Sequence, residues 1–220
     1  MKKFNRDSDS FLFLNNHYRE RKRKRNMITT WYHGTNETSA INICEKGIDF
    51  SKSKKELDFG IGFYLTDDIE VAERRARKTT NKYNRRYKKK DRPAVVSVDV
   101  DTDIIDNLQV RHFDYCNNEW LRFVLANRLS PQFVQSSREL ILEHNLDLKY
   151  DVVIGSIADS DVSQLVEYIE MGSTDINKLS VYELVTDDGR TLGEQMSLHT
   201  HKSLKCVKKK SFHVLDERRN

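Results

Sequence analysis

The segments WYHGT (Trp31–Thr35) and DFGIGFYLT (Asp58–Thr66) each place a polar aromatic side chain near a glycine, at one end of a short β-type run. Glycine has no Cβ, so another group can approach its backbone closely. A neighbouring aromatic ring offers a flat surface for stacking. This combination suits a flat ring that carries an amide, and nicotinamide is such a ring.

Local sequence signals predict the elements that follow the first segment. Residues 27–32 are rich in β-branched and aromatic side chains, which predicts a strand that Gly34 ends. Residues 36–46 then read as a helix, for which Thr38 or Ser39 is a suitable N-cap. The first segment is therefore expected to lie at a strand-to-helix junction.

The second segment leads into a strand over 63–66 and then into a helix that acidic residues 67–68 cap and that runs to about Tyr87. Further along the chain, the patterns predict strands over 94–100, 150–155, 195–199 and 211–215, and helices over 117–128, 132–144 and 161–171. Strands and helices do not alternate regularly, so an α+β fold fits better than a doubly wound sheet.

Length and composition predict one main domain. The 220 residues divide into a basic arm over 1–26, a domain over 27–212 and a tail over 213–220. With 37% hydrophobic and 33% charged residues and no long apolar run, the chain reads as a protein without a membrane span. Three scattered cysteines fit neither a disulfide framework nor a zinc site, and they favour the cytoplasm.

Charge is unevenly distributed along the chain. Residues 17–25 hold six Arg or Lys against one Glu, and residues 74–92 hold eleven against one Asp. The first segment carries a net +5 and the second +10, so the remainder carries −11 in a chain of net charge +4. This asymmetry suits a polyanionic partner, either nucleic acid or an acidic protein. The equally weighted alternative is a solvated face with a loose basic arm.

The order of these motifs resembles the ADP-ribosyltransferase superfamily. YHGT followed by GxGFYLT and a helix is similar to its poly(ADP-ribose) polymerase and diphtheria-toxin branch, which uses a His-Tyr-Glu triad. NEWLRFVLANR (118–128), YDVVIGSIAD (150–159) and EQMSLHTHKSL (194–204) are similar to a bacterial family of unknown function assigned to this superfamily. The resemblance implies a split β-sheet core with surrounding helices, and NAD as a substrate.

The resemblance assigns roles to the two opening segments. His33 maps to the histidine that bonds a ribose hydroxyl, and Gly34 to the glycine whose backbone pairs with the nicotinamide amide. Tyr64 maps to the tyrosine that stacks on nicotinamide. The cofactor-binding set is His33, Gly34, Thr35, Gly60, Gly62 and Tyr64, in which Thr35 steadies the first turn and the two later glycines allow close packing. Because adjacent strand residues face opposite sides, Phe63 is assigned to the core.

The third triad position falls on Gln195, beside Glu194, which would face the other side of a strand. A carboxylate can stabilise the oxocarbenium-like state that forms as nicotinamide leaves, whereas a glutamine can only orient a ribose hydroxyl. The predicted catalytic residues are therefore Gln195, Tyr64 and His33. The alternative for Gln195 is that it merely satisfies a buried backbone group. No histidine or cysteine spacing predicts a metal.

These observations favour an NAD-dependent mono-ADP-ribosyltransferase that modifies a nucleic acid or a protein. The resemblance also implies a toxin-like role and a cognate antitoxin as a partner. Two alternatives remain at this point. One is a catalytically inactive module of the same fold that binds nucleic acid through 19–25 and 74–92. The other is an NAD glycohydrolase that transfers ADP-ribose to water only.

Overall fold

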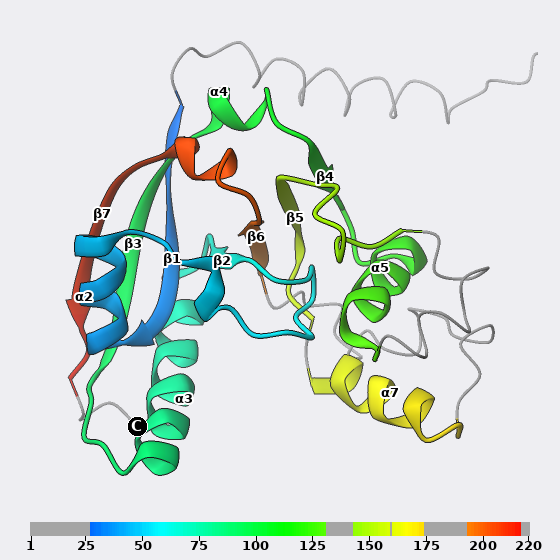
Figure 1. Ribbon diagram of the computed structural model, residues 1–220, viewed down its shortest axis with the longest axis horizontal. Coiled ribbons are helices and arrows are strands. Elements are labelled where there is room, and N and C mark those ends of the chain that lie inside the picture. The colour runs from blue at the N-terminus through cyan, green and yellow to red at the C-terminus, as the bar shows by residue number, and fades with distance from the viewer. Residues whose placement is uncertain (1–26, 131–142, 159, 174–192, 217–220) are drawn as a thin grey trace, which may run out of the picture.

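The computed structural model describes residues 27–130, 143–158, 160–173 and 193–216. Its centre is a seven-stranded sheet in the order β4-β5-β6-β2-β1-β3-β7 (Figure 1). Among the described strands, β4 and β5 alone pair in parallel, and the other neighbouring pairs are antiparallel. The strands are β1 (Ile28–Asn36), β2 (Phe63–Thr66), β3 (Pro93–Asp101), β4 (Val110–His112), β5 (Val152–Ser156), β6 (Glu194–Leu198) and β7 (Val207–Val214).

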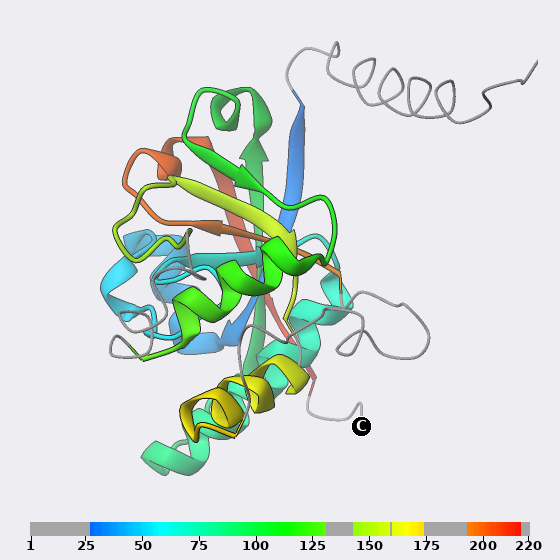
Figure 2. The same cartoon turned by 90° about the vertical axis from the view of Figure 1, so that its right-hand side faces the viewer.

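The sheet opens between β2 and its neighbour β1. β1 pairs with β3 along its whole length, from Ile28 to Asn36, but its registered pairing with β2 is confined to Tyr32 and Thr66. Figure 2 shows β5 and β6 running across the direction of β1, β3 and β7. The fold is therefore an α+β fold whose sheet consists of a β1-β3-β7 half and a β2-β6-β5-β4 half.

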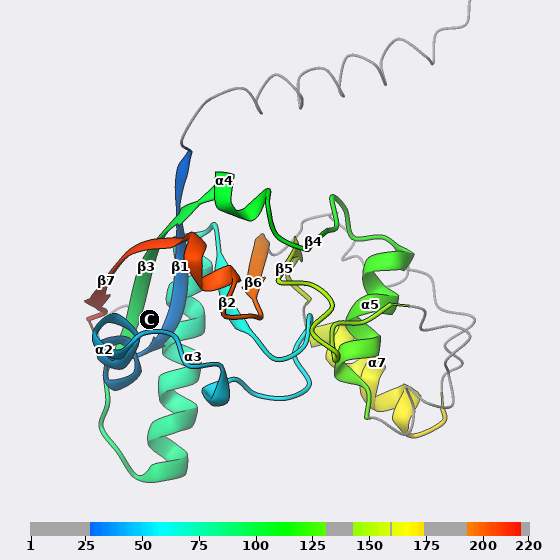
Figure 3. The same ribbon diagram turned by 45° about the horizontal axis from the view of Figure 1, so that its top comes forward.

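Helices cover the two halves separately. In the first half, α2 (Glu37–Lys46) and α3 (Ile69–Tyr87) lie on opposite faces, as Figure 3 shows. In the second half, α5 (Asn118–Arg128) and α7 (Ser160–Glu170) cover one face and bury an aromatic core around Phe59, Phe113 and Phe123. The short α4 (Thr102–Ile105), η1 (Phe50–Lys52) and η4 (Ser203–Cys206) fill the connections.

Helix caps explain where the longer helices begin. Asp68 Oδ1 accepts hydrogen bonds from the backbone N–H groups of Glu70 and Val71, so the expected acidic cap of α3 is confirmed, as is its end at Tyr87. The cap of α2 is Asn36, whose Oδ1 accepts from the Ser39 N–H at 2.8 Å, and not the expected Thr38 or Ser39. Because the cap is Asn36, the last residue of β1, helix α2 begins at Glu37, which is earlier than a cap at Thr38 or Ser39 would allow.

The strand boundaries differ from expectation at two places. β1 continues through Gly34 to Asn36, because β3 supplies backbone partners as far as Pro93. At the other end of the domain, His213 and Val214 pair with β3, and Leu215 packs against α3 with 7% of its surface exposed. The domain boundary expected at 212 therefore falls inside β7, and the sheet includes residues up to 214.

Most of the other expected elements are confirmed. The strands predicted over 94–100, 150–155 and 195–199 and the helices over 117–128 and 161–171 appear with small shifts at their ends. The sequence patterns missed β4, which has only three residues. The predicted helix over 132–144 and the arm over 1–26 lie wholly or mostly outside the described residues. No described helix is both long and apolar enough to cross a membrane.

Candidate functional site

Three neighbouring strands carry the three residues that the sequence singled out. His33 lies on β1, Tyr64 on β2 and Gln195 on β6, and these strands are adjacent in the sheet. In the register of β2 and β6, Tyr64 lies opposite Ser197 and Thr66 opposite Gln195. Directly opposed residues share a face, so Tyr64 and Gln195 emerge from the same face of the sheet.

His33 bridges the opening between β1 and β2. Its Nδ1 lies 2.8 Å from the backbone oxygen of Tyr64, and a carbonyl can only accept, so Nδ1 carries the proton. The ring stacks on Phe63 with centroids 4.5 Å apart. Burial outweighs the opposing effect of the Tyr64 hydrogen bond and lowers the pKa of His33. The imidazole is therefore neutral at pH 7, with Nε2 as an acceptor that no described residue uses.

The rings of His33 and Tyr64 leave the sheet on opposite faces. Tyr32 lies opposite Thr66, so Tyr32 shares the face of Tyr64, and His33 shares that of Phe63. The structure therefore brings Tyr64 and Gln195 onto one face. His33 lies on the other face, and its polar contact with these residues is the hydrogen bond to the backbone oxygen of Tyr64. The assignment of Phe63 to the core is confirmed, since 8% of its surface is exposed.

Gly34 has a structural reason to be glycine. A Cβ built on this residue would lie 2.0 Å from the backbone oxygen of Ala72 and 2.7 Å from the nitrogen of Ala76, both in α3. Close approach was expected here from a ligand, and the structure shows that helix α3 already occupies the space beside the Cα. Thr35 lies within β1, not in a turn, and its backbone oxygen accepts from the Thr80 hydroxyl at 3.4 Å.

The hydroxyl of Tyr64 forms two hydrogen bonds with the backbone of the loop that precedes β2. It accepts from the Phe59 N–H at 2.9 Å and donates to the Gly60 oxygen at 2.6 Å. Burial, with the charge of Asp58 nearby, raises the pKa of Tyr64 well above its ordinary value. The phenol stays protonated, so Tyr64 is a poor proton acceptor.

Gly60 and Gly62 shape the same loop. Gly60 has a φ of 87°, a conformation that side chains rarely adopt. A Cβ on Gly62 would lie 2.8 Å from both Nδ1 of His199 and the oxygen of Leu198. His199 donates from Nδ1 to the Ile61 oxygen, and burial lowers its pKa to about 4. The close packing expected at Gly62 is thus against β6 and the residue that follows it.

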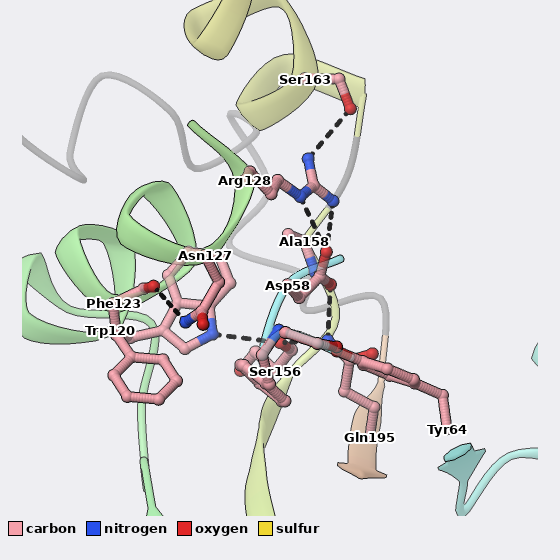
Figure 4. Close-up of polar contacts among 12 residues, drawn as sticks. Asp58, Tyr64, Trp120, Phe123, Asn127, Arg128, Ser156, Ala158, Ser163 and Gln195 are labelled. Atoms are coloured by element: carbon pink, nitrogen blue, oxygen red, sulfur yellow. Dashed lines mark hydrogen bonds and ion pairs between the residues drawn. The ribbon is translucent and has the colours of Figure 1, made fainter. Parts of the chain in front are cut away.

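Gln195 belongs to a buried polar network that the sequence did not reveal (Figure 4). Its Nε2 donates to Asp58 Oδ2 at 2.6 Å and to the Ser156 oxygen at 3.2 Å. Oδ1 of the same aspartate accepts from Nε and Nη2 of Arg128, and Oδ2 also accepts from the Ala158 N–H. The Asp58 and Arg128 side chains are 10% and 14% exposed, so this is a nearly buried ion pair.

Glu194 faces away from this network. It is opposite Ser156 in the register of β5 and β6, whereas Gln195 is opposite Gly155, so the two side chains leave β6 on opposite faces. An oxygen of Glu194 lies 3.5 Å from Nε2 of His112, and this hydrogen bond raises the pKa of His112. Glu194 is therefore not positioned to replace Gln195 on the Tyr64 face.

Asp58 opens the second segment quoted above and Arg128 ends the segment over 118–128, but neither was predicted to belong to a site. Seventy residues separate the two partners. The local signal was the position of each residue: an acid just before Phe-Gly, and an arginine at the end of a helix whose middle is rich in apolar residues. Neither signal identifies its partner.

These contacts define an α+β protein whose sheet opens between β1 and β2 and whose three central strands carry His33, Tyr64 and Gln195. The chain belongs to a family of proteins of unknown function, DUF3990, whose model matches residues 29–209. The matched segment contains all three residues and the basic run over 74–92, and it excludes the basic residues 17–25. No curated protein matches the chain at a significant level.

Proposed function

We propose that this protein is an NAD-dependent mono-ADP-ribosyltransferase of the His-Tyr-Glu branch, in which glutamine stands at the third position. The observation that carries the proposal is the order of three residues. The resemblance makes His33, Tyr64 and Gln195 the triad, and these residues lie on three adjacent strands, with Tyr64 and Gln195 on one face of the sheet and His33 on the other.

In this proposal each residue acts through the group that the fold leaves available. Nε2 of His33 accepts a hydrogen bond from a ribose hydroxyl, since Nδ1 is engaged by Tyr64. The ring of Tyr64 packs against nicotinamide, and the Gln195 amide orients the adjacent ribose. The bond between C1′ and the nicotinamide nitrogen breaks with its electron pair leaving on nicotinamide, and the acceptor nucleophile bonds to C1′ and loses a proton.

Nicotinamide release from NAD, together with transfer of labelled ADP-ribose to lysate RNA, DNA or protein, tests this reaction directly. We expect His33→Ala and Tyr64→Ala to lower the rate on the order of 100-fold, because each removes a group that positions NAD. His213→Ala and Tyr168→Ala are matched controls on exposed residues and should retain activity. Absence of both nicotinamide release and transfer by the wild-type protein would refute the enzyme.

The surface of α3 favours nucleic acid over protein as the acceptor. Arg75, Lys82 and Arg86 are exposed and recur at spacings of seven and four residues, which places them in one stripe about 16 Å long. Partial burial and the charges of these three residues lower the pKa of Lys54, so Lys54 lies near the same stripe. None of the four forms an ion pair with a described acidic residue.

An aromatic pair lies beside this basic stripe. The rings of Tyr83 and Tyr87 have centroids 5.0 Å apart, and the Arg86 guanidinium lies 5.6 Å above the Tyr87 ring. Tyr87 is 54% exposed. Basic residues that follow a phosphate backbone, next to rings on which bases stack, are the features with which proteins bind single-stranded nucleic acid. The positive charge of Arg75 also contributes to lowering the pKa of His33, so one end of the stripe lies near the proposed site.

Binding of a fluorescent single-stranded oligonucleotide across a salt series tests the stripe. For Lys54→Gln/Lys82→Gln/Arg86→Gln we expect weaker binding and a slope of log affinity against log salt reduced by about 2, from three phosphate contacts. The matched control, Lys202→Gln/Lys205→Gln/Lys209→Gln, removes the same charge from exposed residues near η4 and β7. Equal losses in the two variants would show that net charge, not the stripe, determines binding.

The second candidate is an inactive module of this fold that binds nucleic acid through the same stripe. Its support is Gln195, which lacks the charge of a carboxylate and is engaged by Asp58. Calorimetry with NAD separates the candidates, since the inactive module would bind the oligonucleotide and not NAD. A glycohydrolase, the third possibility, would release free ADP-ribose with no labelled acceptor.

A further inference from the structure

We infer that Asp58 is a positioning residue that fixes the Gln195 carboxamide in one orientation, with the nitrogen turned into the network and the oxygen left for a ligand. The fold therefore requires an amide at position 195 and disfavours a carboxylate there. The consequence for catalysis rests on the proposed function, but the orientation itself does not.

The orientation follows from the chemistry of the two partners. Asp58 offers a carboxylate oxygen at 2.6 Å and Ser156 a backbone carbonyl at 3.2 Å, and both are acceptors. Only the NH2 group of the amide can satisfy two acceptors, so the nitrogen must face them. No described residue donates to Oε1 of Gln195. A ribose hydroxyl would thus meet an acceptor at this position.

The charge balance explains why a carboxylate is disfavoured. The negative charge of Asp58 is already paired with Arg128, whose Nε and Nη2 both donate to Oδ1 of the aspartate. A glutamate at position 195 would add an unpaired charge beside Asp58 and the Ser156 oxygen, at a residue that is 7% exposed. Burial and a like charge both raise the pKa of a carboxyl group.

The pH dependence of thermal stability in Gln195→Glu tests this inference without requiring any activity. The introduced carboxyl group should have a raised pKa in the folded state, so its destabilisation is small below the unfolded pKa of about 4.3 and grows as the pH rises through the folded pKa. We expect the deficit in Tm relative to Gln195→Met to be at least about 4 °C larger at pH 8 than at pH 5. Gln195→Met removes the same hydrogen bonds without adding a charge.

Among the described residues, a few charged or titratable groups lie near position 195. Asp58 and Arg128 form the ion pair, Tyr64 stays protonated because burial raises its pKa, and Asp67 lies beside β6, where its Oδ1 accepts from the Glu194 N–H. Tyr64 and Asp67 are common to both variants, so the comparison with Gln195→Met removes their contributions. The difference in pH dependence then reports the interaction between Asp58 and the introduced carboxyl group.

Asp58→Asn/Gln195→Glu supplies the reverse test. In this double variant the amide at 58 can donate to the introduced carboxylate, and Arg128 balances its charge, so the growth of the Tm deficit with pH should disappear. If the Gln195→Glu protein folds only at acidic pH, that outcome also supports the inference, because the ionised carboxylate then prevents folding. A pH-independent deficit in Gln195→Glu, or faster nicotinamide release without loss of stability, would overturn the inference. Absence of NAD cleavage in every variant would count only against the proposed function.

Discussion

Gly34→Ala should unfold the domain or leave it severely destabilised. The added Cβ would lie 2.0 Å from the backbone oxygen of Ala72 and 2.7 Å from the nitrogen of Ala76. Because both atoms belong to the α3 backbone, no side-chain rotation relieves the contact, and the helix must move away from β1. Overpacking a core costs roughly 1–3 kcal/mol when side chains can adjust, and we expect a loss above about 3 kcal/mol here. Urea unfolding followed by circular dichroism measures it.

Gly47→Ala is the matched control for this prediction. Gly47 follows α2 with a φ of 94°, so alanine is strained there, but no atom lies within 4 Å of the added Cβ. With a ψ of 179°, Gly47 lies in a region that only glycine adopts readily, so a loss of about 1–3 kcal/mol is expected. If Gly34→Ala were no worse than Gly47→Ala, α3 could not be packed against β1 as described.

Gly34 also shows how much of its structural surroundings can be predicted from the sequence. The segment around it correctly predicted a strand, but that strand continues past Gly34 to Asn36. The glycine was expected to allow close approach by a ligand, whereas the group that lies beside it in the structure is the α3 backbone. The identity of that group depends on where α3 packs, which is set by contacts between residues almost forty positions apart. Local patterns report propensities and caps, so they located β1, α2 and α3 without fixing how those elements contact one another.

The same limit applies to the two faces of the candidate site. Alternation within a strand predicted that Phe63 and Tyr64 point to opposite sides, and the structure confirms it. Which of these sides His33 shares depends on the register between β1 and β2, which a sequence pattern in either strand does not contain. Likewise, Gln195 was identified by its position on a late strand, but its partner Asp58 is brought to it by the fold.

Arg128→Met is expected to cost about 3–5 kcal/mol of folding free energy, the range observed when one partner of a buried ion pair is removed. The substitution leaves the Asp58 carboxylate, which is 10% exposed, with hydrogen bonds from Gln195 and Ala158 but without a compensating charge. The methionine preserves much of the volume, so the loss reports the charge and not a cavity. Denaturant unfolding at pH 7 measures it.

Two further variants isolate the contribution of the charge. Arg92→Met removes an arginine that also donates two hydrogen bonds to one carboxylate, on Glu37, but at a side chain 55% exposed, and it should cost much less because water screens exposed pairs. Asp58→Asn/Arg128→Met removes both charges and should be more stable than Arg128→Met alone. The loss of unfolding free energy in the double variant could instead equal the sum of the losses in Asp58→Asn and Arg128→Met. Asp58 and Arg128 would then contribute independently, and their charge pairing would not link the loop before β2 to α5.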